Sequence, residues 1–133
     1  MRRARGLILS TAVLLAACGD VKPLTAPPLG PGEHLVTVAD FSFTPPEVVI
    51  RPGDAVTWRN TGSAHNVRAE NGSFRCSRGC DGGGGNGELS AEAWSFSITF
   101  TQVGELAYFC ESHGAHGGLG MAGRVVVRAA GQP

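Results

Sequence analysis

Residues 106–128 read LAYFCESHGAHGGLGMAGRVVVR, and the rest of the chain can be interpreted outward from this stretch. Its two ends are rich in valine and aromatic residues, which favour β-strands, and the glycines between them indicate a loop. The loop region carries one thiol, two imidazoles and one thioether, from Cys110, His113, His116 and Met121. Donors of these types together suit copper. The stretch therefore predicts two strands that flank part of a copper site.

The segments before this stretch also have the pattern of strands. Residues 93–101 alternate almost perfectly, so that Trp94, Phe96 and two further apolar side chains share one face. Residues 47–51 and 55–60 flank a Pro-Gly-Asp turn, and we expect them to pair as a hairpin. Residues 41–46 are expected to interrupt the pairing. Strands are expected at residues 34–39, 47–51, 55–60, 64–69, 93–101, 106–110 and 124–128.

The fold class follows from this pattern. No segment after the N-terminal region has a convincing helical period. About seven to eight short strands, with turns every ten or so residues, indicate an all-β sandwich.

His65 shares a strand face with Val67. Alone, such a histidine is more often an ordinary rim residue than a ligand. It becomes a candidate ligand only together with the C-terminal cluster of donors.

Residues 70–92 are glycine-rich and have no apolar period, so we expect a long excursion on the surface. Cys76 and Cys80 lie within it and can close a small disulfide loop that restrains the segment. The alternative is a second metal site, but two cysteines at this spacing without nearby histidines are a weak zinc signal. We expect the disulfide.

The N-terminus has the layout of an export signal. A basic start is followed by an apolar run that is too short to span a bilayer, and residues 15–18 read LAAC, which resembles the bacterial lipobox. We therefore expect a signal peptide at residues 1–17, a lipid on Cys18, a Pro/Gly-rich tether at residues 18–32 and one domain at residues 33–133. The expected location is the bacterial periplasm or cell surface; the alternative is an ordinary secretory signal with a chance cysteine.

Charge and cysteine usage narrow the function. The chain has 11 basic and 11 acidic residues, and loss of the three arginines of the signal leaves a net charge of about −3 without a basic cluster. Nucleic acid is therefore an unexpected partner. Thiols outside the cytoplasm become oxidised unless they are lipidated, bound to metal or sheltered. Cys110 has no partner once the other three cysteines are assigned, and metal binding would explain it.

These residues resemble those of the cupredoxins, the plastocyanin- and azurin-like small blue copper proteins. The matching features span residues 35–128 and are His65-Asn66, the Tyr-x-Cys-x2-His run that starts at Tyr108, the Gly-Met-x-Gly run around Met121 and the closing valines. The resemblance implies a Greek-key β-sandwich with one type 1 copper near one end, and single-electron transfer as the activity.

The same resemblance implies which residues bind the metal. The expected ligands are His65, Cys110, His113 and Met121, and Asn66 is expected to tie the ligand loop and to hydrogen-bond toward the cysteine sulfur. His113 has the family's spacing from the cysteine, whereas His116 has the family's spacing from the methionine. His113 is preferred because of the Cys-x2-His-Gly opening, and His116 remains the alternative.

Two functions stay open at this point. One is a membrane-tethered, monomeric electron carrier that acts between redox proteins; the other is an exported copper protein for delivery, storage or resistance. A buried cysteine-containing site favours the carrier, because delivery sites are often exposed and rich in methionine or histidine. An enzyme would need further copper ligands, which this chain lacks. A sandwich without metal would leave Cys110 unexplained.

Overall fold

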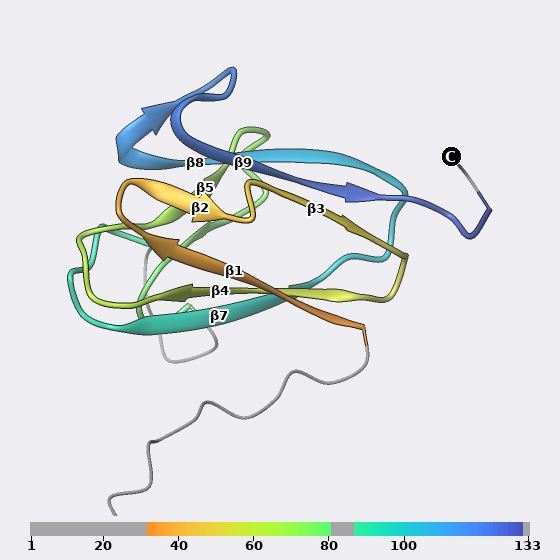
Figure 1. Cartoon of the computed structure of the whole chain (residues 1–133), viewed down its shortest axis with the longest axis horizontal. Coiled ribbons are helices and arrows are strands. Elements are labelled where there is room, and N and C mark those ends of the chain that lie inside the picture. Colours follow the sequence, from red (N-terminus) through yellow and green to blue (C-terminus); the bar gives the residue numbers. More distant parts are fainter. Residues whose placement is uncertain (1–31, 81–86, 132–133) are drawn as a thin grey trace, which may run out of the picture.

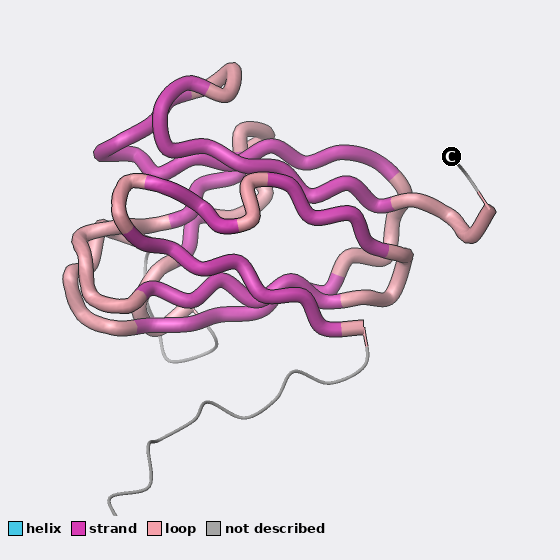
Figure 2. Tube along the Cα trace, in the orientation of Figure 1, coloured by secondary structure: helices cyan, strands magenta, loops and turns pink. Residues whose placement is uncertain are grey.

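A computed structural model describes residues 32–80 and 87–131. The predicted signal peptide at residues 1–17, the predicted lipidation site Cys18 and the tether as far as residue 31 lie outside the described residues. The described part forms two facing β-sheets without a helix (Figures 1 and 2). It accordingly has no helix long and apolar enough to cross a membrane.

The two sheets together contain nine strands in the described residues. One sheet has the order β2-β1-β4-β7 and the other the order β3-β9-β8-β5-β6. The pairs β1/β4 and β3/β9 are parallel, and the remaining pairs are antiparallel. The prediction of an all-β sandwich is confirmed. The strands are β1 (Glu33–Ala39), β2 (Ser42–Thr44), β3 (Glu47–Ile50), β4 (Ala55–Asn60), β5 (Val67–Ala69), β6 (Arg75–Cys76), β7 (Trp94–Thr99), β8 (Gly104–Ala115) and β9 (Leu119–Val127).

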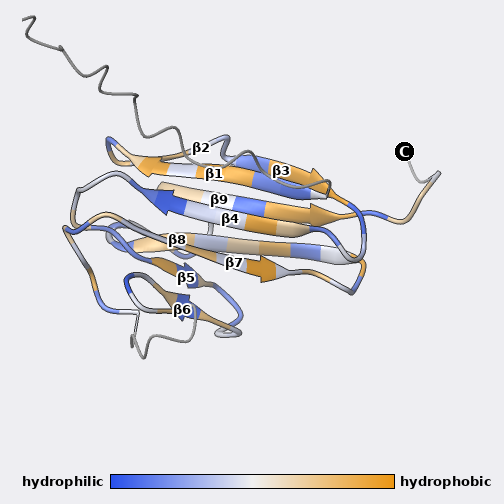
Figure 3. Ribbon diagram, turned by 90° about the horizontal axis from the view of Figure 1, so that it is seen from below, coloured by the Kyte–Doolittle hydropathy of each residue, from blue (hydrophilic) through white to orange (hydrophobic). Residues whose placement is uncertain are grey.

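The core lies between the sheets, where the apolar residues of the strands pack together. Figure 3 shows how hydrophobic and hydrophilic residues are distributed along the strands. Trp58 of β4 is fully buried and stacks on Phe96 of the neighbouring β7, with 5.2 Å between ring centroids. Tyr108 of the opposite sheet meets Trp58 edge-on at 5.3 Å. Full burial of a large apolar side chain stabilises a fold by roughly 1.5–3 kcal/mol. This aromatic cluster therefore ties β8, the strand of the expected cysteine ligand, to the opposite sheet.

The predicted hairpin of residues 47–51 and 55–60 is wrong. β3 pairs with β9, whereas β4 pairs with β1 and β7, so the two strands belong to different sheets. The turn itself forms as expected: Asp54 N–H donates to the Arg51 carbonyl at 3.0 Å. The turn carries the chain from one layer to the other because both strands have an apolar face, and facing layers bury both faces.

Three other expectations about strands need correction. Residues 41–46 do not interrupt pairing, because β2 forms within them and pairs with β1. The strand expected at residues 64–69 begins only at Val67, and His65 makes an isolated bridge to Ser90. Residues 70–92 are not wholly a surface excursion: β6 pairs with β5, and Phe74 packs against the core. Short-range turn signals did not reveal these long-range contacts.

The glycine-rich stretch expected as a loop is mostly strand. β8 continues to Ala115 and β9 starts at Leu119, so the two form a long hairpin with a short turn (Figure 1). Gly114 pairs with Gly120 in this hairpin. A Cβ atom at Gly114 would lie 2.3 Å from the Met121 carbonyl oxygen. The glycines therefore allow the two backbones to approach closely rather than forming a flexible loop.

The predicted disulfide between Cys76 and Cys80 is confirmed. It closes a loop with a sequence separation of 4. The loss of chain entropy in the unfolded state predicts a contribution of about 2 kcal/mol for a loop of this size.

The Cys76→Ala/Cys80→Ala variant of the copper-free protein should lose about this much unfolding free energy in urea titrations. A dithiol reductant should bring the wild type to the value of the variant; an unchanged urea midpoint in both cases would contradict the prediction.

Candidate metal centre

A bulge in β8 places the first two candidate ligands. Phe109 pairs with Ala122, and the next regular pair is Gly114 with Gly120, so the four residues from 110 to 113 face one residue of β9. A bulge leaves residues unpaired and redirects their side chains. Cys110 is fully buried, and its Sγ lies 3.5 Å from Nδ1 of His113.

His65 comes from the connection between β4 and β5. Its backbone N–H donates to the Ser90 carbonyl and its carbonyl accepts from Ser90 N–H, both at 3.2 Å. The side chain is 1% exposed, and Nε2 has no hydrogen-bond partner among the described residues. Burial, followed by the proximity of His113, lowers the pKa of His65. Both effects favour the neutral ring, which is the form that binds metals.

Three donor atoms from these residues converge on one point. Sγ of Cys110 lies 3.7 Å from Nδ1 of His65, and the two Nδ1 atoms are 3.2 Å apart. A point equidistant from all three atoms would be about 2 Å from each, close to the ~2.0–2.1 Å and ~2.3 Å of zinc bonds to imidazole and thiolate. Lone pairs that converge in this way repel one another unless a cation or proton lies between them. The donors therefore fit one metal ion.

Met121 lies opposite the bulge. It is 1% exposed and belongs to the same buried cluster as Cys110. Gly120 has a φ of +65°, and a Cβ atom there would lie 2.4 Å from the His113 carbonyl oxygen. Glycine at this position thus lets β9 pass close to His113. The expected fourth ligand is therefore buried on the strand that pairs with β8, the strand of Cys110 and His113.

His116 lies apart from the donor cluster. It is exposed in the turn of the hairpin, and its ring packs on Phe109 with 4.8 Å between centroids. Adjacent residues of a strand point to opposite faces, so Phe109 and Cys110 do not share a face. The cluster of mutually close donors contains His65, Cys110 and His113, without His116.

Glu111 is a residue of this region that the sequence did not reveal. It accepts hydrogen bonds from Arg75 Nε at 2.8 Å, Arg68 at 2.7 Å and Asn66 Nδ2 at 2.5 Å. Arg75 first, and then Arg68 and Asn66, hold the pKa of Glu111 down at about 2, although burial opposes them. Asn66 ties the ligand segments together as expected. Its side-chain nitrogen, however, donates to Glu111 and to the Gly87 carbonyl rather than toward the cysteine sulfur.

Phe41 was also missed, because it lies in a segment expected only to break a strand. Its ring meets His113 edge-on at 4.7 Å and His65 at 6.2 Å between centroids. The side chain is 67% exposed. Asp40 and Phe41 have φ values of 48° and 59°, which are unfavourable for residues other than glycine. The β1–β2 turn thus holds an exposed aromatic ring over two of the candidate ligands.

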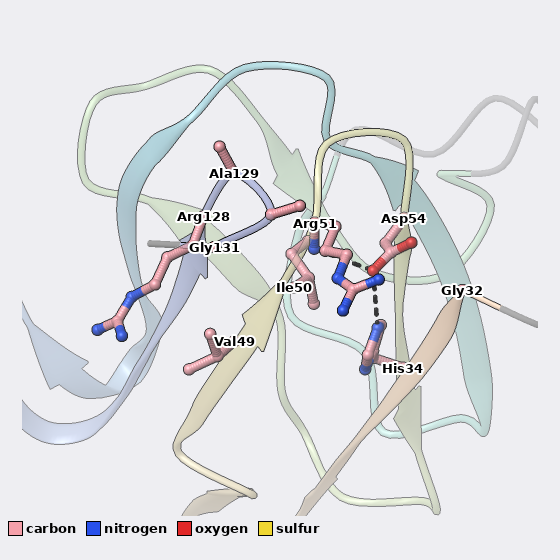
Figure 4. A pocket seen from close by; sticks show the side chains of 10 residues that line it. Gly32, His34, Val49, Ile50, Arg51, Asp54, Arg128, Ala129 and Gly131 are labelled. Carbon is pink, nitrogen blue, oxygen red and sulfur yellow. Dashed lines mark hydrogen bonds and ion pairs between the residues drawn. The ribbon is translucent and has the colours of Figure 1, made fainter. Parts of the chain in front are cut away.

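The remaining histidine of the described residues lies far from this cluster. The start of β1 lies at the opposite end of the sandwich from the β8–β9 turn (Figure 1). His34 there lines a hollow, where its Nε2 is 3.2 Å from Asp54 Oδ2 (Figure 4). The backbone N–H of Arg51 also donates to this carboxylate and lowers the pKa of Asp54, with a smaller effect from His34. His34 of β1 therefore contacts the turn at residues 51–54 and is not part of the metal centre.

Comparison with known proteins agrees with this geometry. The sequence model of the family described as copper binding proteins, plastocyanin/azurin family, matches residues 33–128. The chain belongs to this family. Copper is therefore the cofactor of the protein, in agreement with the thiolate, imidazole and thioether donors. The expectation of one type 1 copper is confirmed.

Relatives within the plastocyanin/azurin family include plastocyanins and amicyanins. Amicyanin-alpha of Methylorubrum extorquens is 31% identical over 125 residues, which cover 93% of this chain and 94% of that protein. The chloroplastic plastocyanin of Tetradesmus obliquus is 36% identical over 87 residues, or 65% of this chain and 58% of that protein. An oxidised mutant of amicyanin has a similar structure, with a TM-score of 0.52 and 27% identity over 75% of this chain and 86% of the amicyanin chain.

Proposed function

We propose that this protein carries single electrons, with one copper held by His65, Cys110, His113 and Met121. The observation that carries the proposal is the convergence of one buried thiol and two imidazole nitrogens within a β-sandwich. Bound copper would supply one-electron chemistry between two oxidation states. His116 stays outside the site, and we propose no catalytic reaction.

The surrounding structure suits an electron carrier because it keeps the donors in place. Cys110 directly follows Phe109, which is paired with Ala122 of β9, and His65 is bridged through its backbone to Ser90. The sandwich therefore resists the change of geometry that would slow electron transfer. Cys110 is fully buried and His65 nearly so, which excludes water from both residues.

His113 offers the route for electrons. It is the only one of the three clustered donors that is partly exposed. Phe41 and Leu119 flank this end of the sandwich and are 67% and 65% exposed. Exposed apolar residues around a buried centre suit brief contact with a redox protein, because such contacts form and separate easily.

The proposed location is outside the cytoplasm, in the periplasm or at the cell surface. The predicted export signal at residues 1–17 and the LAAC run before the tether support attachment to the membrane through a lipid on Cys18. We propose that the protein acts as a monomer. The disulfide between Cys76 and Cys80 also suits an oxidising compartment. Mass spectrometry of the protein from bacterial membranes should find an acylated Cys18 at the mature N-terminus.

An experiment can separate the carrier from a copper delivery protein. The copper(II) protein is mixed with reduced cytochrome c in a stopped-flow instrument, in the presence of a copper(I) chelator. A carrier should take one electron in a fast second-order step and retain its copper. Transfer of copper to the chelator at the rate of reduction would instead support delivery.

Phe41 provides a test of the route through His113. Phe41→Ala should leave the visible copper spectrum nearly unchanged, because the ring donates no ligand, but it should slow electron exchange with cytochrome c several-fold. Val103→Ala is the matched control, since Val103 is an apolar residue, 55% exposed, next to the start of β8 at the other end. Equal rates for wild type and both variants would exclude Phe41 from the docking surface.

A further inference from the structure

Glu111 gathers contacts from three separate segments beside the metal centre. It follows Cys110 in β8, and its side chain is 19% exposed. Its carboxylate accepts from Arg68 of β5 at 2.7 Å, from Arg75 of β6 at 2.7 and 2.8 Å, and from Asn66 at 2.5 Å. Hydrogen bonds between charged groups are the strongest kind in proteins. One carboxylate thus holds β5, β6 and the segment after His65 against β8.

The contact with Asn66 is made at two points. Asn66 Nδ2 donates to the carboxylate of Glu111, and the backbone N–H of Glu111 donates to Asn66 Oδ1 at 3.0 Å. Asn66 is fully buried. Because Asn66 follows His65 and Glu111 follows Cys110, this closed pair of bonds restricts the separation of the two ligand residues. The two ligand residues are the immediate chain neighbours of this bonded pair, and their Sγ and Nδ1 atoms are 3.7 Å apart.

Two other carboxylate–arginine pairs of the described residues lack this character. Glu47 pairs with Arg124, and their side chains are 41% and 55% exposed. Glu92 and Arg78 are each 65% exposed. Such surface ion pairs contribute about 0–1 kcal/mol to the free energy of unfolding. Glu111 is less exposed, meets two arginines and also bonds to a buried amide, so its loss would remove several charged and polar contacts at once.

We propose that Glu111 is a positioning residue for the copper site, acting through Asn66 and through its ion pairs with Arg68 and Arg75. The inference rests on the proposed ligand set. The arginines hold the carboxylate in the orientation that accepts from Asn66, and Asn66 in turn holds His65 at its distance from Cys110. Groups that orient metal ligands typically change metal affinity by about 10- to 100-fold when they are removed.

The test compares Glu111→Ala with wild type in the full copper-loaded protein. The measurements are the rate of copper loss to a chelator and the copper electron paramagnetic resonance spectrum. Glu111→Ala should lose copper about tenfold faster or more, with a changed hyperfine splitting. Glu111→Gln keeps an oxygen acceptor for Asn66 and should fall between the two. Glu47→Ala removes the same charge from a pair with Arg124 and should match wild type.

Arg75→Met supplies a second variant that leaves Glu111 and Asn66 in place, in case Glu111→Ala does not fold. Arg75→Met should also lose copper faster than wild type and should also have a changed hyperfine splitting. Both effects should be smaller than in Glu111→Ala. A wild-type spectrum and copper-loss rate in all Glu111 and Arg75 variants would overturn the positioning role. An identical change in Glu47→Ala would also overturn it, because the effect would then follow net charge. Absence of a type 1 spectrum in the wild type would instead refute the proposed function.

Discussion

The Cys110→Ser variant, loaded with copper, is expected to lose the intense visible absorption of the wild-type protein. That band would arise from charge transfer between the thiolate of Cys110 and copper, and a serine hydroxyl offers no comparable sulfur orbital. The fully buried position of Cys110, with imidazole nitrogens at 3.5 and 3.7 Å, makes it the donor on which the band depends. Absorption spectra at equal copper content provide the measurement.

The matched control is the Cys76→Ser/Cys80→Ser variant, which removes sulfur elsewhere in the chain. It should retain the band, because its cysteines form a disulfide and are not among the clustered donors. A band of wild-type intensity in Cys110→Ser would remove the cysteine from the proposed site. Loss of the band in both variants would indicate that folding, rather than ligation, controls it.

Substitution of the two neighbouring histidines should have very different effects. His113→Ala is expected to abolish or strongly shift the band, because Nδ1 of His113 lies 3.2 Å from its counterpart in His65. His116→Ala should leave the band in place, because this ring is exposed and packs on Phe109. The two substitutions remove the same group three residues apart, so each is the control for the other.

Spectra of the two histidine variants at several copper concentrations give the measurement. If both histidine variants retain the visible band equally, the assignment of His113 as a ligand is wrong. If only His116→Ala loses the band, the spacing from Met121 rather than from Cys110 identifies the ligand.

The sequence predicted those parts of the structure that depend on local patterns. The alternation around Trp94 and Phe96 identified β7, and the short spacing from Cys110 to His113 identified two donors that the structure brings together. His65 is distant in sequence; the C-terminal donor cluster gave it weight, and the resemblance to a known family placed it in the ligand set.

Other features depend on contacts that a local pattern does not contain. The turn at residues 51–54 has ordinary turn chemistry, which does not determine whether the flanking strands pair or enter different sheets. The glycines at 114 and 120 suggested a loop, but they allow close approach of two paired strands. Glu111 and Arg75 are 36 residues apart, and nothing near either residue signals their contact.

The electron self-exchange rate of the wild-type protein tests the proposed function most directly. Mixtures of the copper(I) and copper(II) forms can be followed by the broadening of proton resonances from His65 and His113. If the protein is a carrier with a preformed site, electrons should pass rapidly between its copper(I) and copper(II) molecules without loss of copper, because the copper ligands barely move. Slow exchange accompanied by release of copper(I) would contradict the electron-carrier function and favour copper delivery.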